Sequence, residues 1–136
     1  MITVDMKVGR LIEIRSVQPY TLEEIAFLGG RLAQLMQGRS DRIVGCLDLR
    51  GAGVAPSEHT ELYAAVLRRD NPLVERTGVL LPPGQATLAL QLERIVREAH
   101  NPRRKTFRDV APFCAYLDEV LTTEEQARMR AFLAAI

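Results

Sequence analysis

The segment from Cys46 to Ser57 carries the residues of this chain best suited to chemistry. An apolar run ends in Asp48 and Arg50, a glycine-containing loop follows, and the loop leads to Ser57, where a helical pattern begins. In open α/β sheets, ligands bind at the carboxyl ends of strands, and the free N–H groups of a helix start attract anions. A hydroxyl in that position is suited to accept a phosphoryl group or to contact a partner.

Two interpretations of Ser57 remain open. As an N-cap, its oxygen would accept a hydrogen bond from an unpaired helix N–H, a contact worth about 1 kcal/mol. As a phosphoacceptor, it would hold a phosphate at the helix start, helped by Arg50 and opposed by Glu58 and Glu61. A nucleophilic pair with His59 is disfavoured because residues two apart on a helix do not face each other. The sequence has no Gly-x-Ser-x-Gly elbow, so we expect no enzymatic activity.

The loop and the helix start together form the expected surface for a protein partner. The residues assigned to that surface are Asp48, Arg50, Gly51, Gly53, Ser57 and His59. For Asp48 and Arg50 a second interpretation also stays open, in which they form a local ion pair or a solvated part of the loop.

A second group of charges is the basic cluster Arg103, Arg104, Lys105 and Arg108. Such a cluster either stays solvated near a helix C-terminus or contacts an anion, an acidic partner or a lipid headgroup. The run lacks interleaved aromatic side chains for base stacking. The chain has 18 Lys and Arg against 17 Asp and Glu, a net charge of +1, so we expect no nucleic-acid partner.

Length and composition point to one globular domain. The 136 residues are enough for a real core, and a hydrophobic fraction of 47% is ordinary for a globular protein. No apolar run approaches the ~20 residues of a membrane span, and the N-terminus lacks a secretory signal pattern. We expect a cytoplasmic protein without stable membrane insertion. Cys46 and Cys114 are expected to be buried free thiols, and no Cys/His spacing suggests a metal, so we expect no metal or cofactor.

Hydrophobic periodicity gives the order of elements. The predicted strands cover 2–6, 12–15, 43–49, 74–81 and 105–108, and the predicted helices cover 22–35, 57–69, 85–100, 112–121 and 122–136. Thr21 with Glu24, and Thr122 with Glu125, form capping boxes. This order predicts an α/β fold: one domain over 1–136 with a mixed, mostly parallel sheet of about five strands. An N-terminal hairpin opens it, the core spans about 2–121, and an extra C-terminal helix covers about 122–135.

Two motifs support a family resemblance. The first is Leu47-Asp48-Leu49-Arg50-Gly51, followed by Ser57, and the second is Thr106-Phe107-Arg108-Asp109, followed by Phe113, Tyr116 and Leu117. Through them the chain resembles the STAS fold, and within it the SpoIIAA-like group related to anti-sigma-factor antagonists. The phosphorylated Ser of the antagonists falls by spacing on Ser57. The chain departs from their pattern at Arg50, Pro56 and His59, where the antagonists have Ser, Asp and Gly.

The resemblance implies a non-catalytic, regulatory protein-binding module of a bacterial signalling pathway. The alternative function that it implies is a small-ligand protein that binds a lipid or a nucleotide. That function requires an apolar cavity between helices and sheet, lined for example by Leu62, Leu88 and Phe113. The apolar residues Met129, Phe132 and Leu133 of the last helix either pack within the domain or form a homodimer surface, and the sequence does not decide between these.

Overall fold

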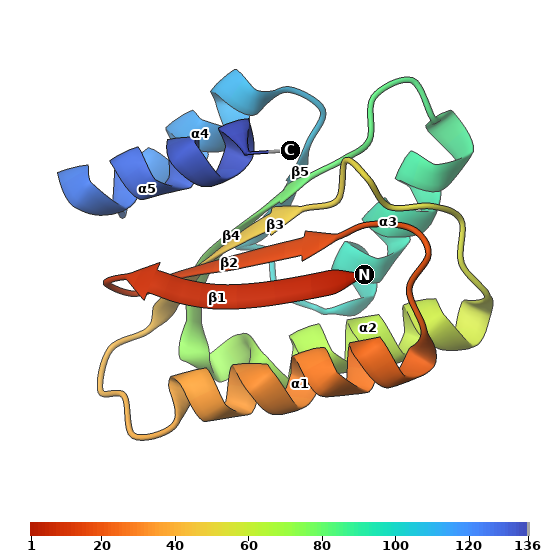
Figure 1. The fold of residues 1–136 in the computed structure, drawn as a ribbon, viewed down its shortest axis with the longest axis horizontal. Helices are drawn as coiled ribbons and strands as arrows, with labels where there is room; N and C mark the ends of the chain where they lie inside the picture. Colours follow the sequence, from red (N-terminus) through yellow and green to blue (C-terminus); the bar gives the residue numbers. More distant parts are fainter. Residues whose placement is uncertain (136) are drawn as a thin grey trace.

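The N-terminal residues form a hairpin at one edge of a five-stranded sheet, in a computed structural model that describes residues 1–135 (Figure 1). β1 (Ile2–Val8) pairs antiparallel with β2 (Leu11–Ser16). Gly9 lies in the turn with a φ of +54°, a left-handed conformation that favours glycine. The predicted hairpin is therefore confirmed.

The remaining strands run parallel to β2, so the sheet is mixed as predicted. β3 (Ile43–Asp48), β4 (Val74–Leu80) and β5 (Arg104–Phe107) follow in the order β1-β2-β3-β4-β5. Every residue of β3 is buried, because helices cover both faces of this central strand. The loops that leave the carboxyl ends of β3 and β4 therefore emerge at the same end of the sheet.

Three helices cover one face of the sheet (Figure 1). They are α1 (Leu22–Met36), α2 (Ser57–Asp70) and α3 (Ala86–Glu98), and a short 3₁₀ turn at Asn71–Leu73 follows α2. Gly29 of α1 allows close packing against α2, since a Cβ there would lie 3.2 Å from Val66 Cγ2. Gly29 therefore serves the contact between two helices of the same layer.

Two helices, α4 (Val110–Asp118) and α5 (Thr123–Ala134), cover the opposite face (Figure 1). Met129, Phe132 and Leu133 of α5 are buried with Phe113 in the core on this side. They pack within the domain, so they do not form a dimer surface. The helix predicted to reach residue 136 ends at Ala134, and Ile136 lies outside the described residues.

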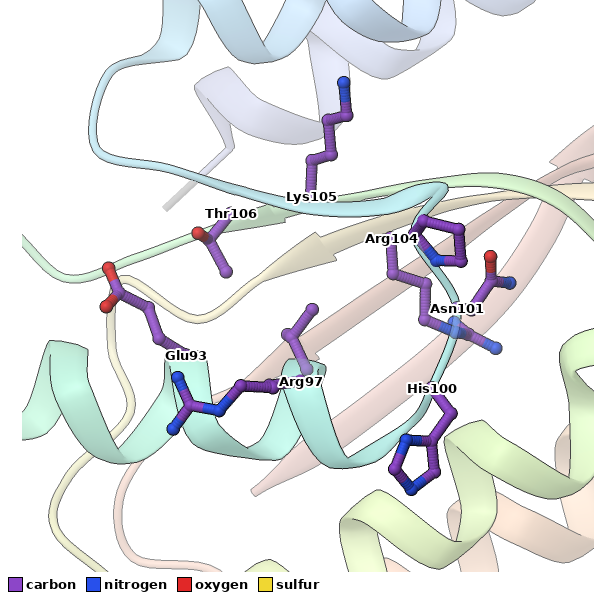
Figure 2. A pocket seen from close by; sticks show the side chains of 9 residues that line it. Glu93, Arg97, His100, Asn101, Arg104, Lys105 and Thr106 are labelled. Carbon is purple, nitrogen blue, oxygen red and sulfur yellow. The ribbon is translucent and has the colours of Figure 1, made fainter.

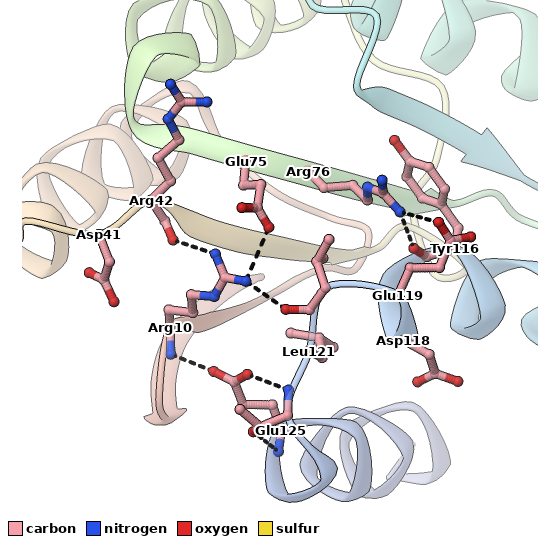
Figure 3. A network of polar contacts seen from close by, with 12 residues as sticks. Arg10, Asp41, Arg42, Glu75, Arg76, Tyr116, Asp118, Glu119, Leu121 and Glu125 are labelled. Carbon is pink, nitrogen blue, oxygen red and sulfur yellow. Dashed lines mark hydrogen bonds and ion pairs between the residues drawn. The ribbon is translucent and has the colours of Figure 1, made fainter.

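Arg10, next to the hairpin turn, connects the first strands to the α4–α5 layer (Figure 3). Its backbone N–H donates to Glu125 Oε2 (2.8 Å), and its guanidinium donates to the carbonyl of Val120 (2.6 Å) and to Glu75 (3.1 Å). Glu125 also accepts from the backbone N–H of Thr122 (2.8 Å), which completes the capping box of α5. The Glu125 carboxylate therefore accepts hydrogen bonds both from the start of α5 and from the turn between β1 and β2.

Both predicted capping boxes are present, the other being Thr21 with Glu24 at the start of α1. Each satisfies backbone N–H groups that a helix start leaves unpaired. Within residues 1–135, none of the helices combines the length and the apolar character that crossing a bilayer requires.

Candidate functional site

The helix α2 begins at Ser57 as predicted, but Ser57 is not its N-cap. Pro56 occupies the cap position with extended backbone angles, and no side chain caps the helix. Ser57 is the first helical residue, and its carbonyl accepts a hydrogen bond from Thr60 Oγ1 (2.8 Å). The predicted cap bond is therefore wrong, because a side chain at this position is past the point where it can reach the free N–H groups. The Ser57 side chain is exposed to solvent.

The two glycines of the loop between β3 and α2 let it pack against the segment that follows β2. A Cβ at Gly53 would lie 2.7 Å from Gln18 Cδ, and one at Gly51 would lie 3.2 Å from Val17 Cγ2. The backbone N–H of Gln18 donates to the Gly51 carbonyl (2.9 Å). Both glycines therefore allow the loop to lie close to this segment, and a larger residue at 53 would displace the Gln18 side chain.

The second half of the same loop is attached to α3. Gln91 Nε2 donates to the Ala55 carbonyl (2.9 Å), and the Ala55 N–H donates back to Gln91 Oε1 (3.4 Å). Between the two attachments, Val54 is 62% exposed. The loop thus presents an apolar side chain and, three residues later, the hydroxyl of Ser57 on a backbone that is held at both ends.

His59 is half-buried and lies beside Tyr20, with ring centroids 6.4 Å apart. Its Nδ1 is buried and has no hydrogen-bond partner among the described residues. Only part of this ring is therefore available to a partner.

Asp48 and Arg50 form the local ion pair that was one of the two interpretations of the sequence. The Asp48 carboxylate accepts from Arg50 Nε (2.9 Å) and from Arg15 Nε of β2 (2.9 Å), and its side chain is only 5% exposed. Burial alone would raise the pKa of Asp48, but hydrogen bonds from Arg50 and Arg15 outweigh it and hold that pKa below its usual value. The hydrogen bond to Asp48 in turn raises the pKa of Arg50.

Both arginines use their remaining donors to hold the end of α5. Arg15 Nη2 donates to the carbonyl of Phe132 (2.5 Å), and Arg50 Nη2 donates to that of Leu133 (2.7 Å). The Arg15 guanidinium also lies 4.1 Å from the centroid of the Phe132 ring. Cations are favourable at the C-terminal end of a helix. Asp48 and Arg50 are therefore engaged within the molecule, whereas Val54 and Ser57 in the outer part of the loop remain exposed.

Within the basic cluster, Arg104 is withdrawn from solvent. It is 6% exposed, and its guanidinium donates to the Leu67 carbonyl (2.8 Å), Thr77 Oγ1 (3.0 Å) and Asn71 Oδ1 (3.1 Å). Burial lowers the pKa of Arg104 to about 10. Arg104 therefore connects β5 to β4 and to the end of α2, and it has little capacity left for an external anion.

The other three members of the cluster stay at the surface. Arg103 is exposed, Lys105 Nζ lies 5.0 Å from the Tyr116 ring centroid, and Arg108 pairs with Glu93 at 3.3 Å. The expected anion contact is thus reduced to these three side chains, of which Arg108 already has a carboxylate partner.

The interior offers little room for a lipid. The two enclosed apolar cavities between sheet and helices have volumes of about 10 and 20 Å³, room for about one water molecule each. Leu88 belongs to the core on the α1–α3 face and Phe113 to the core on the opposite face. These two residues cannot line one cavity, so the geometry gives no support to the internal carrier site.

The thiols and the acidic groups add no reactive centre among residues 1–135. Cys46 and Cys114 are free and buried as predicted, and burial raises the pKa of both thiols. This part of the chain contains no group of three or more His, Cys, Asp or Glu side chains placed to hold a metal ion.

A cavity of about 470 Å³ borders the predicted residues Asp48 and Arg50, and sequence reasoning missed a second one, of about 550 Å³, between α3 and β5. Its wall includes Asn101, the first residue of the basic run, and Arg97 and His100, which extend that run back into the end of the preceding helix. Only the nearby basic run hinted at an anion-binding region.

Neither a scan against models of known protein families nor a search of curated proteins gives a match for this chain.

Proposed function

We propose that this chain is a non-catalytic regulatory module of the SpoIIAA-like kind that binds a protein partner in the bacterial cytoplasm. The partner would contact the loop that connects β3 to α2 and the first turn of α2. The observation that carries this proposal is the exposure of Val54 and Ser57 on a loop that is anchored to both the β2–α1 segment and α3.

The anchored loop favours binding for two physical reasons. A loop that already has its bound conformation loses little conformational entropy when the partner docks. Burying an exposed valine contributes roughly 1.5–3 kcal/mol, since its apolar surface leaves water. Val54 would therefore be the apolar centre of the contact, with Ser57 at its border.

Phosphorylation of Ser57 would then act as a switch on that contact. A phosphate at the first turn of α2 gains from the free N–H groups and from the helix dipole. Arg50, the basic neighbour expected from the sequence, is engaged by Asp48 and the Leu133 carbonyl. Arg94 lines the same small cavity as Ser57 and is paired with Glu98 at 2.8 Å. The Arg94–Glu98 pair is more exposed than the Arg50–Asp48 pair and is therefore exchanged more easily, which makes Arg94 the better candidate to hold the phosphate.

Site-specific photo-cross-linking in native cells tests this proposal. A photo-reactive residue at Val54 should capture one defined protein. The same residue at Leu73 is the control, because Leu73 is also exposed (45%) but lies before β4, away from the loop. Capture of the same protein from both positions, or of none from Val54, would refute the assigned surface.

The switch is tested in the same assay with Ser57→Asp. The matched control is Thr123→Asp, because Thr123 is the first residue of α5 and is exposed as Ser57 is in α2. We expect Ser57→Asp to change the cross-linking yield at Val54 at least several-fold, and Thr123→Asp to leave it unchanged. Equal yields in both variants would rule out a role for charge at Ser57.

A further inference from the structure

The strand β5 forms the edge of the sheet opposite the hairpin, and one side of its backbone has no neighbouring strand. The Thr77 N–H donates to the Arg103 carbonyl (3.1 Å), and the Leu81 N–H donates to the Phe107 carbonyl (2.9 Å). In a parallel ladder, alternate residues direct both backbone groups toward the neighbour. Lys105 and Phe107 therefore direct their backbone groups toward β4, and Arg103 directs its carbonyl there.

The intervening residues, Arg104 and Thr106, direct theirs away from the sheet. The Arg104 N–H donates to the Asn101 carbonyl (3.0 Å). The N–H and carbonyl of Thr106 and the carbonyl of Arg104 have no protein partner within residues 1–135. These outward N–H and C=O groups are the ones with which an additional strand would form hydrogen bonds.

The cavity of about 550 Å³ lies directly beside this edge, between β5 and α3 (Figure 2). Thr106 and Arg97 lie on its opposite sides. Asn101 is 8% exposed and also lines it; its Oδ1 accepts from the Arg103 N–H, whereas its buried Nδ2 has no partner among the described residues. An unpaired buried amide donor is unfavourable, so the wall of the cavity offers a donor as well as positive charge.

The charges around the edge are mostly positive, and Glu93, which also lines the cavity, is paired with Arg108 at 3.3 Å. Arg97 and Arg103 are exposed and have no ion pair within the described part of the chain. His100 is exposed on the cavity wall. Lys105 points away from α3, toward Tyr116 on the other face of the sheet (Figure 2). An acidic segment would meet positive charge on both faces of β5.

A second copy of β5 does not fit the same edge. Pairing two copies would bring Arg103, Lys105 and Arg108 near the same residues of the other chain, and like charges across a strand pair are destabilising. Charge complementarity therefore selects an acidic partner over a second copy.

We propose that β5 is a docking edge for an extended, acidic segment of a partner protein, which adds as a further strand and pairs with Thr106. Directly opposed residues in a sheet place their side chains on the same face. The residue opposite Thr106 therefore directs its carboxylate into the cavity, toward Arg97. Its neighbours face Phe107 and Tyr116, where apolar side chains fit. This surface is separate from the Val54 loop, so the proposal stands whether or not the loop binds a partner.

A blocked synthetic peptide in which glutamate alternates with valine is the probe. Titrated into the full chain at low salt, it should shift the backbone amide signals of Thr106 and Arg108 in NMR spectra. It should also slow hydrogen exchange at the Thr106 N–H. A peptide with glutamine in place of glutamate, and free glutamate, are the two ligand controls.

The variant Thr106→Pro removes the outward N–H while sparing the ladder with β4, since proline is tolerated at a sheet edge. We expect it to weaken peptide binding about ten-fold or more, because the ring also hinders pairing. Thr106→Val is the matched control and should bind as the wild type does. If Thr106→Pro does not fold, hydrogen exchange in the wild-type chain is the test instead: the peptide must slow exchange at the Thr106 N–H for the proposed pairing to hold.

Arg97→Gln tests the cavity, with Arg68→Gln as the control for loss of charge at an exposed position on α2. We expect about three-fold weaker binding for Arg97→Gln at low salt and no change for Arg68→Gln. The proposal is overturned if the glutamine peptide binds equally well, if free glutamate produces the same shifts, or if the shifts map to β1. Absence of binding also overturns it, and the basic residues would then serve only to keep other strands away.

Discussion

Asp48 connects three separate parts of the molecule through its two arginine partners. It lies at the end of β3, holds Arg15 of β2 and Arg50 of the loop, and through them reaches the last carbonyls of α5. The side chains of Arg15 and Arg50 are 20% and 27% exposed, whereas that of Asp48 is 5% exposed. Removal of the Asp48 charge would leave two partly buried cations facing each other.

We expect Asp48→Asn to lower the free energy of unfolding by about 2–3 kcal/mol at neutral pH. This value is below that for a fully buried pair, because both arginines keep some contact with water. Urea unfolding followed by circular dichroism measures the change. Asp41→Asn, which breaks the exposed pair with Arg39, should have no measurable effect.

The contribution of Asp48 should also depend on pH. Its pKa is lower in the folded chain than in the unfolded chain, where an aspartate has a pKa of about 3.9. The unfolded chain therefore binds the proton first on acidification, and the stabilisation is complete above about pH 5 and lost as pH falls through the folded pKa. The difference in stability between wild type and Asp48→Asn should shrink below about pH 4. A difference that stays constant down to acid pH would contradict this account.

Glu125 shows how one side chain joins two elements. It belongs to the capping box of α5 and also accepts from the Arg10 N–H next to the β1–β2 turn. A Cβ at Gly9 would lie 2.2 Å from Glu125 Oε2, so the glycine leaves room for the carboxylate. The last helix is thereby fixed to the first hairpin.

We expect Glu125→Ala to destabilise the chain by about 2–3 kcal/mol, because two backbone donors, the N–H groups of Thr122 and Arg10, lose their acceptor. Thr122→Ala should cost about 1 kcal/mol, the usual value for a cap. Glu124→Ala, at an exposed neighbouring position, is the control and should be close to neutral. Urea denaturation provides all three values. Equal effects of Glu125→Ala and Thr122→Ala would show that the contact with Arg10 contributes nothing.

The elements could be predicted from sequence because their signals are local. The alternation of apolar and polar residues predicted the hairpin, and the continuous apolar run predicted β3. The capping boxes at Thr21 and Thr122 predicted the starts of α1 and α5. An exception was the cap of α2: the helix begins at Ser57 as predicted, but Pro56 and not Ser57 takes the cap position. Proline fixes φ at about −65° but leaves ψ free, and this φ suits both the cap and the first turn, so the residue types alone do not decide between Pro56 and Ser57 as the cap.

The roles of the site residues could not be predicted in the same way, because their partners are distant in sequence. Arg50 binds the carbonyl of Leu133, and Arg15 binds that of Phe132, contacts that leave no local pattern. The burial of Arg104 did have a signal. Strand alternation places it on the same face as Thr106, toward α3, which argues against treating the whole basic run as one surface.

At the scale of the whole molecule, the two helical layers differ in how they are held. The layer of α1, α2 and α3 shares one large apolar core with the sheet, whereas α4 and α5 share a smaller one. Polar contacts supplement the smaller core at both ends of α5: Glu125 at its start, and Arg15 and Arg50 at its end. The end of α5 is thereby linked to the strand that leads into the proposed partner loop.

We therefore expect α5 to open as a local unit when its end is released. In the double variant Arg15→Gln and Arg50→Gln, amides in the last turn of α5 should exchange hydrogen at least about ten-fold faster, because two charge-assisted bonds are lost. Amides of α1 and β4 should accelerate less, because only the loss of global stability from the unpaired Asp48 carboxylate reaches them. Arg130→Gln is the control. Arg130 also lies on α5, and its ion pair with Asp118 of α4 is more exposed. Uniformly faster exchange would show that α5 and the sheet open together, and unchanged exchange in α5 would show that its apolar residues alone hold it.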